Sequence, residues 1–102
     1  MRFETTRSFD ADFRRLKSEH QKAFRIAVKV FSSACDEFAG TPGYRWPSAL
    51  RVSPMKGTRG IWGMMWSFAS PDGRATFELV RRGDDLVCRW RRIGDQRVLR
   101  AP

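Results

Sequence analysis

The sequence predicts an α+β fold in which a helical hairpin packs on an antiparallel sheet, in the element order βααββββ. Apolar residues recur at every third or fourth position through residues 10–39, which is the spacing of amphipathic helices. They alternate with other residues through 49–55, 61–69, 74–80 and 86–93, which is the spacing of strands. Helices followed by consecutive strands that short turns can join are typical of an α+β domain.

The length and composition indicate one globular domain over residues 1–102. The chain has 102 residues, close to the commonest domain size, and 41% of them are hydrophobic, which excludes a disordered protein. No apolar run approaches the roughly 20 residues of a membrane span. Residues 1–9 lack the apolar core of a signal peptide. We therefore expect a cytoplasmic protein with no membrane partner.

The N-terminal part is expected to hold a short strand and two helices. Residues 2–9 alternate as a strand does, and Ser8 or Asp10 can cap the helix expected over 10–19. Residues 21–39 have the strongest helical periodicity in the chain. Their stripe should pack on the sheet and carries three aromatic rings: Phe24, Phe31 and Phe38.

A loop and a basic turn are expected before the central strand. Residues 40–48 contain two Pro and two Gly, which precludes regular structure. Trp46 within this loop could stack on a nucleic-acid base, or it could pack against the rest of the domain and hold the loop in place. We favour the packing role. A strand follows over 49–55, ended or interrupted by Pro54. Residues 56–60 form a turn with two cations and two glycines.

Residues 61–69 are expected to form the central strand, because both of its faces are largely apolar. Residues 71–73 and 82–85 are hairpin turn signals on either side of a strand over 74–80. One face of the central strand should carry Trp62, Met64, Trp66 and Phe68.

The last clear strand, residues 86–93, alternates cationic and apolar side chains. Strict alternation places Arg89 and Arg91 on one face with Ile93, where they would line the floor of a groove. The tail after Gly94 is expected to be extended at Val98 and Leu99.

Positive charge is concentrated in the second half of the chain. The net charge is +9, and residues 45–102 hold twelve Lys and Arg against five Asp and Glu, which is +7. Sixteen of the twenty cations are Arg, which is suited to bidentate phosphate contact. This asymmetry favours a nucleic acid or an acidic protein as partner, although surface arginines without a ligand are the simpler alternative.

The two cysteines and the single histidine point to no metal site and no cofactor. Cys35 and Cys88 lie far apart, so a disulfide is conceivable, but two buried thiols are favoured in a cytoplasmic protein. Neither has a Cys or His at metal-ligand spacing. His20 lies at the join between the two expected helices, and a solvent-facing or capping role is favoured over catalysis.

The segments WPSALRVSPMKGTRGIWGMMWSFASPDGRATFELV and WRRIGDQRVL resemble the RelE/ParE superfamily of type II toxin–antitoxin toxins. They are similar to a RelE-like subgroup that reads roughly WP-x-SLRVK…GIWE-x-x-W…DGRATF…WRRIG-x-H. The resemblance implies a cytoplasmic toxin held inactive by a cognate acidic antitoxin. RelE-type members act on the ribosome and cleave mRNA, whereas ParE-type members bind DNA gyrase. The WRRIG ending favours the RelE side.

The resemblance also implies a set of site residues in a basic groove around the last strands. The catalytic set would be Lys56, Arg74, Arg91 and Gln96. The RNA-binding set would be Arg51, Lys56, Arg59, Arg74, Arg89, Arg91, Arg92 and Arg97.

Two positions depart from the subgroup and bear on catalysis. Position 96 often holds a histidine and position 63 an acid, but this chain has Gln96 and Gly63. Glutamine exchanges no proton near neutral pH. A possible endoribonuclease therefore stands beside two alternatives: a non-catalytic module that binds RNA, the ribosome or an antitoxin, and a gyrase-directed toxin.

Overall fold

The computed structural model describes residues 1–40, 43–67 and 72–102, so the expectations for Phe68 and for the turn at Pro71 lie outside the described residues. The fold is α+β, as expected, with two helices and one five-stranded sheet. The elements are β1 (Arg2–Thr5), α1 (Arg7–Arg15), α2 (Ser18–Gly40), the 3₁₀ helix η1 (Ser48–Leu50), β2 (Ser53–Pro54), β3 (Ile61–Ser67), β4 (Gly73–Arg82), β5 (Asp85–Gly94) and the 3₁₀ helix η2 (Gln96–Arg100).

The sheet is mixed, and the expectation of an antiparallel sheet is wrong at one edge. The strand order is β1-β5-β4-β3-β2, in which β1 runs parallel to β5 and every other pair is antiparallel. Arg2 pairs with Val87 and Thr5 with Trp90. Tight turns impose antiparallel pairing, but two helices and three strands separate β1 from β5 in sequence, so no turn sets their direction.

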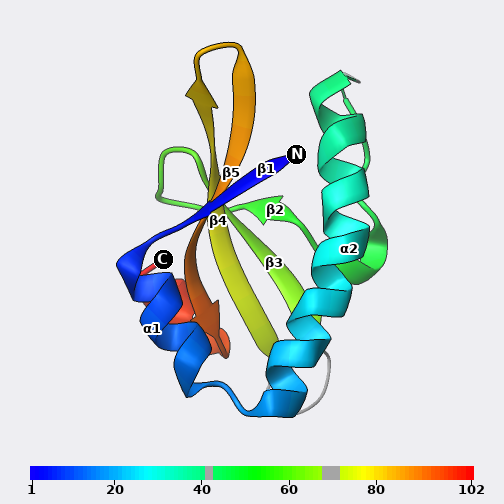
Figure 1. The fold of residues 1–102 in the computed structure, drawn as a ribbon. Coiled ribbons are helices and arrows are strands. Elements are labelled where there is room, and N and C mark those ends of the chain that lie inside the picture. The colour runs from blue at the N-terminus through cyan, green and yellow to red at the C-terminus, as the bar shows by residue number, and fades with distance from the viewer. Residues whose placement is uncertain (41–42, 68–71) are drawn as a thin grey trace.

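Both helices pack on the same face of the sheet, but they diverge from their short connection (Figure 1). At that end Phe9 and Phe13 of α1 reach Phe24 of α2, with ring centroids 5.8 and 6.1 Å apart. Further along, α2 lies over β3, while α1 lies against β5. The hairpin is therefore open, and it leaves part of the sheet uncovered between its arms.

The core lies between this sheet face and the two helices. Trp62, Met64 and Trp66 of β3 all contribute to it, as the alternation predicted. Trp46 stacks on Phe38 with ring centroids 4.9 Å apart, which confirms that it packs the loop against the rest of the domain. Both cysteines are buried free thiols, also as expected: Cys35 and Cys88. Within the described residues, neither helix is both long and apolar enough to cross a membrane.

A β-bulge in β5 changes which side chains reach the core. Thr76 pairs with Arg92 but Phe77 pairs with Trp90, so Arg91 is the extra residue. Because of this insertion, Trp90 and Ile93 both enter the core although they are three residues apart. The expectation that Ile93 shares a face with Arg89 and Arg91 is therefore wrong.

Thr6 holds the bulge and the start of α1 together. Its hydroxyl donates to the carbonyl of Arg91 at 2.8 Å and accepts from the backbone N–H of Phe9 at 3.1 Å. Thr6 is thus the N-cap of α1, a position at which threonine is favoured. The helix begins earlier than expected, so neither Ser8 nor Asp10 caps it.

Two segments expected to be extended are 3₁₀ turns instead. Leu50 ends η1 and is buried, and Arg51 adopts a left-handed conformation with φ 47°, so the strand is limited to Ser53–Pro54. In the tail, Val98 is buried within η2. In both places one apolar side chain is buried by a turn, which strand-like alternation does not reveal.

Candidate functional site

The cations expected to form one groove are divided between two ends and two faces of the sheet. Lys56 and Arg59 lie in the turn before Ile61, which pairs with Glu78. Arg74 pairs with Met65 and lies four residues before Glu78 in β4. Four residues span roughly 13 Å at the rise of a strand, so Arg74 is that far from the Ile61 end. Arg51 precedes β2, and the antiparallel pairing of β2 with β3 places it toward the Met65 end and away from Lys56 and Arg59. These cations therefore do not line one continuous groove.

Arg89 and Arg91 lie on the sheet face opposite the helices, where a carboxylate holds them. Glu78 is 3.8 Å from Arg89 and 3.4 Å from Arg91. Arg91 also donates from Nε to the carbonyl of Pro102 at 3.0 Å, and Thr76 donates to the same oxygen at 3.1 Å. Arg91 thus ties the tail to the sheet, and it lies apart from Arg92 despite their adjacency.

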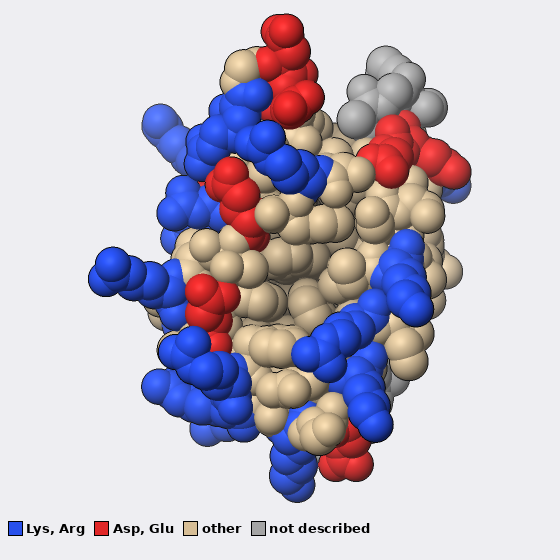
Figure 2. Space-filling model, viewed as in Figure 1, with Lys and Arg blue, Asp and Glu red and all other residues tan. Residues whose placement is uncertain are grey.

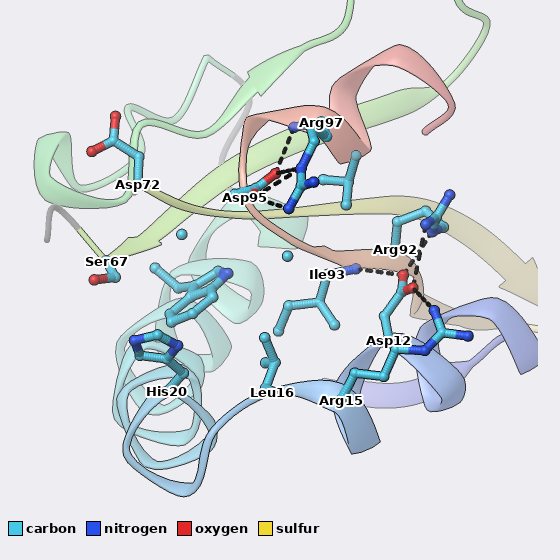
Figure 3. Close-up of a pocket in the computed structure, with 14 residues that line it drawn as sticks. Asp12, Arg15, Leu16, His20, Ser67, Asp72, Arg92, Ile93, Asp95 and Arg97 are labelled. Atoms are coloured by element: carbon cyan, nitrogen blue, oxygen red, sulfur yellow. Dashed lines mark hydrogen bonds and ion pairs between the residues drawn. The ribbon is translucent and has the colours of Figure 1, made fainter. Parts of the chain in front are cut away.

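A pocket with a cavity volume of about 390 Å³ lies where the helical connection meets the ends of β3, β4 and β5 (Figure 3). Its walls come from segments far apart in the sequence. Its charged and imidazole-bearing lining residues are Asp12, Arg15, His20, Asp72, Arg92, Asp95 and Arg97. Apolar side chains complete the lining, among them Leu16, Trp66, Ile93 and Val98.

Asp12 fixes Arg92 at one side of the pocket. Arg92 donates from Nε and Nη2 to the two carboxylate oxygens at 2.6 and 3.2 Å, and the backbone N–H of Ile93 donates to Asp12 at 3.2 Å. This hydrogen bonding raises the pKa of Arg92. Arg15 lies 3.8 Å from the same carboxylate and is otherwise exposed. Asp12 is buried, so α1 is locked onto the end of β5.

Asp95 fixes the start of η2 at the opposite side. Its carboxylate accepts from the backbone N–H of Arg97 at 2.9 Å and from the Arg97 guanidinium at 2.8 to 3.1 Å. The hydrogen bonds from Arg97 lower the pKa of Asp95 to about 2, and the pKa of Arg97 is raised in return. The Arg97 side chain remains exposed to solvent, so its outer edge is open to a ligand.

Asp72 directly precedes β4 and lines the pocket, and Arg74 of β4 lies beside it. Asp72 lies 3.6 Å from Arg74 and accepts from the Gln96 amide at 3.5 Å. The indole N–H of Trp66 donates to the carbonyl of Arg74 at 2.9 Å. Trp66 lies so close to Gly73 that a Cβ there would come within 2.5 Å of the ring, so only glycine fits this approach.

His20 lines this pocket and is partly open to solvent there, which is compatible with the expected solvent-facing role. It is half-buried in the first turn of α2, with its ring centroid 5.9 Å from that of Trp66 in an edge-on arrangement. The structure therefore brings the only histidine to the pocket that Arg92 and Arg97 line. The sequence signal that could have found it is the helix break at residues 16–17, which turns α2 back toward the sheet.

The pocket can bind an anion and exchange a proton, although its charges are nearly balanced. Three guanidinium groups, three carboxylates and one imidazole line it. Histidine is the side chain that ordinarily exchanges protons near neutral pH.

No group of three His, Cys, Asp or Glu side chains in the described part of the chain is placed to hold a metal. No protein-family model, curated protein or solved structure matches this chain.

Proposed function

We propose that this protein is a RelE-like toxin that arrests translation by cleaving mRNA on the ribosome, with the 390 Å³ pocket as the site of the scissile phosphate. One observation carries the proposal. The two segments that resemble the RelE-like subgroup, residues 46–80 and 90–99, both line a pocket that also holds the only histidine. A cognate acidic antitoxin is the partner that such a toxin requires.

The reaction needs three contributions from the pocket. The ribose 2′-oxygen attacks the adjacent phosphorus, so a base must accept the 2′-hydroxyl proton and an acid must protonate the leaving 5′-oxygen. Cations must stabilise the charge that develops on the phosphate. His20 accepts the 2′-hydroxyl proton, which compensates for glutamine at position 96, and solvent water in the open pocket protonates the leaving 5′-oxygen. Arg15, Arg92 and Arg97 are the phosphate ligands.

The carboxylates limit how these cations act. Arg92 keeps its geometry because Asp12 binds it on two atoms. Arg97 binds Asp95 through Nε and Nη2, so Nη1 and the exposed edge of the guanidinium are what would meet a phosphate. Lys56 and Arg59 lie at the other end of the sheet, where they would guide flanking RNA rather than contact the scissile phosphate.

A non-catalytic module that binds RNA or the ribosome is the second candidate. It is favoured by the charge balance of the pocket, in which Asp12, Asp72 and Asp95 each engage an arginine. Such a module would bind RNA with an affinity that falls steeply as salt is raised, because phosphate contacts release counterions. It would leave the RNA intact.

The test is a reconstituted translation reaction with one mRNA, in which 5′ ends are mapped. The wild-type chain should stop translation and cut the transcript. His20→Gln should slow cleavage by about 10²- to 10⁴-fold, the usual contribution of a general acid or base. Lys17→Gln, three residues away and outside the pocket, should cut at the wild-type rate. Circular dichroism checks that both variants fold.

Each result separates the candidates. Cleavage by His20→Gln at the wild-type rate would exclude the assigned role of His20. An intact transcript with the wild-type chain, together with salt-dependent RNA binding, would replace the ribonuclease with the binding module.

A further inference from the structure

The β-bulge in β5 determines where the Arg92 side chain lies. In a regular strand alternate side chains share a face, so Arg92 would share the face of Trp90 and be directed at the aromatic core. Arg91 is the extra residue of the bulge, and beyond it Ile93 takes the core position instead. Arg92 therefore lies outside the core, at the end of β5 that lines the 390 Å³ pocket.

Arg92 differs from neighbouring cations because its guanidinium is fixed. In Figure 2, Lys and Arg side chains gather over α1, and Arg7 and Arg14 of this helix are exposed and lie outside the lining of the pocket. Arg92 instead donates to Asp12 from two nitrogens, at 2.6 and 3.2 Å, and to the carbonyl of Ala101 at 3.3 Å. These bonds use three of its five N–H groups, so two remain for a ligand. Its direction, rather than its charge alone, distinguishes it.

Thr6 contacts both of the segments that hold Arg92. Its hydroxyl donates to the carbonyl of Arg91 at 2.8 Å, which is the bulged residue of β5. The same hydroxyl accepts from the backbone N–H of Phe9 at 3.1 Å and so caps α1. Asp12 lies in that helix, about one turn beyond Phe9. One hydroxyl thus joins the strand that carries the guanidinium to the helix that carries its carboxylate.

We propose that Thr6 is a positioning residue for the pocket, and that its hydroxyl holds Arg92 in the direction in which it meets a phosphate. Without this hydroxyl, the carbonyl of Arg91 loses a donor and the start of α1 loses its cap. Both losses let the guanidinium and the Asp12 carboxylate shift relative to the pocket. The role of Arg92 as a phosphate ligand rests on the proposed function, whereas the dependence of its position on Thr6 does not.

Two adjacent threonines provide matched variants. Thr6→Val keeps the shape of the side chain but removes the hydroxyl, and it should slow mRNA cleavage by about 10- to 10²-fold, the usual effect of a small misplacement at a reacting site. Thr6→Ser keeps the hydroxyl and should cut at close to the wild-type rate. Thr5→Val makes the same change one residue earlier, at an exposed side chain outside the lining of the pocket, and should also cut at the wild-type rate.

The position of Arg92 can be measured without RNA. In a nitrogen–proton NMR spectrum of the full chain, the Nε–H resonance of Arg92 is identified by its loss in Arg92→Lys. The 2.6 Å hydrogen bond to Asp12 should separate this resonance from those of exposed arginines. In Thr6→Val it should move toward them, and in Thr6→Ser and Thr5→Val it should keep its wild-type position. A variant that only lowers stability leaves the resonance of its folded molecules in place.

A second variant covers the case in which Thr6→Val does not fold. Glycine is accepted at helix N-caps, so Thr6→Gly removes the hydroxyl at a smaller cost to α1. It should displace the Arg92 resonance and slow cleavage as Thr6→Val does.

Several results would overturn the inference. These are a wild-type resonance or a wild-type cleavage rate in the folded variants that lack the Thr6 hydroxyl, an equal displacement in Thr5→Val, or no recovery in Thr6→Ser. An intact transcript with the wild-type chain, together with a resonance that moves only when the Thr6 hydroxyl is removed, would refute the ribonuclease alone. Cleavage by the wild-type chain with a resonance that does not move would refute the positioning role alone.

Discussion

Asp12 is the residue on which the junction of α1 and β5 depends. Its carboxylate accepts two hydrogen bonds from Arg92 and one from the backbone N–H of Ile93. Asp12→Ala removes all three hydrogen bonds and leaves a half-buried guanidinium without its carboxylate. We expect a loss of about 2–3 kcal/mol in the free energy of unfolding.

Urea denaturation measures that loss, with Asp10→Ala as control. Asp10 belongs to the same helix but is exposed, so its removal should cost less than about 1 kcal/mol. Equal losses in the two variants would show that the Asp12 contacts add nothing to stability.

Sequence patterns predicted some residues of the site and missed others for one physical reason. Arg92 and Arg97 were predicted and both line the pocket. His20 and Asp12 were not, because each reaches the pocket through the placement of a helix against the end of the sheet. Contacts between residues 80 positions apart leave no periodic signal, as with Asp12 and Arg92.

At the scale of elements, η2 depends on one ion pair whose strength varies with pH. Asp95 has a pKa of about 2 in the folded chain, below its ordinary value of 3.8, because Arg97 binds its charged form. Because the pKa is lowered, the contribution of the Asp95–Arg97 ion pair to the free energy of unfolding is present above pH 4. It is lost as the pH falls from about 4 to 2.

Asp95→Asn tests this dependence and keeps a side chain that caps helices equally well. The unfolding free energies of the wild type and the variant should differ at pH 7 and converge by about pH 2. The difference isolates Asp95 from the other carboxylates, which titrate in both chains. A difference that stays constant over this range would exclude the ion pair as its source.

Periodicity predicted those elements in which the apolar pattern repeats over several helical turns or several strand residues. The α2 stripe and the core face of β3 are two of them. The bulge at Arg91 was not predictable, because the hydroxyl that donates a hydrogen bond to its carbonyl belongs to Thr6, at the other end of the sequence. The 3₁₀ turns η1 and η2 each bury one side chain, which is too short a signal to detect.

At the scale of the whole molecule, both thiols report on global unfolding. Burial raises the pKa of Cys35 to about 12 and raises that of Cys88 as well. At pH 8 neither should react with a disulfide reagent in the folded chain, because the thiolate is the reactive form. Both should react in guanidinium chloride, at a stoichiometry of two.

Above pH 9 the same burial should weaken the fold. The unfolded chain loses its thiol protons there, whereas the folded chain retains that of Cys35 until about pH 12, so stability should fall over this interval. Rapid reaction of either thiol under native conditions would show that the core opens locally rather than as a unit.

The pairing of the first strand with the last has a consequence for folding during synthesis. Arg2 finds its neighbour only when Val87 is available, so β1 has no place in the sheet while the chain is still being translated. The helices, β3 and β4 can assemble earlier through contacts that are closer in sequence. Closure of the sheet is then the last step, and it must overcome the entropy of joining the two ends of the chain.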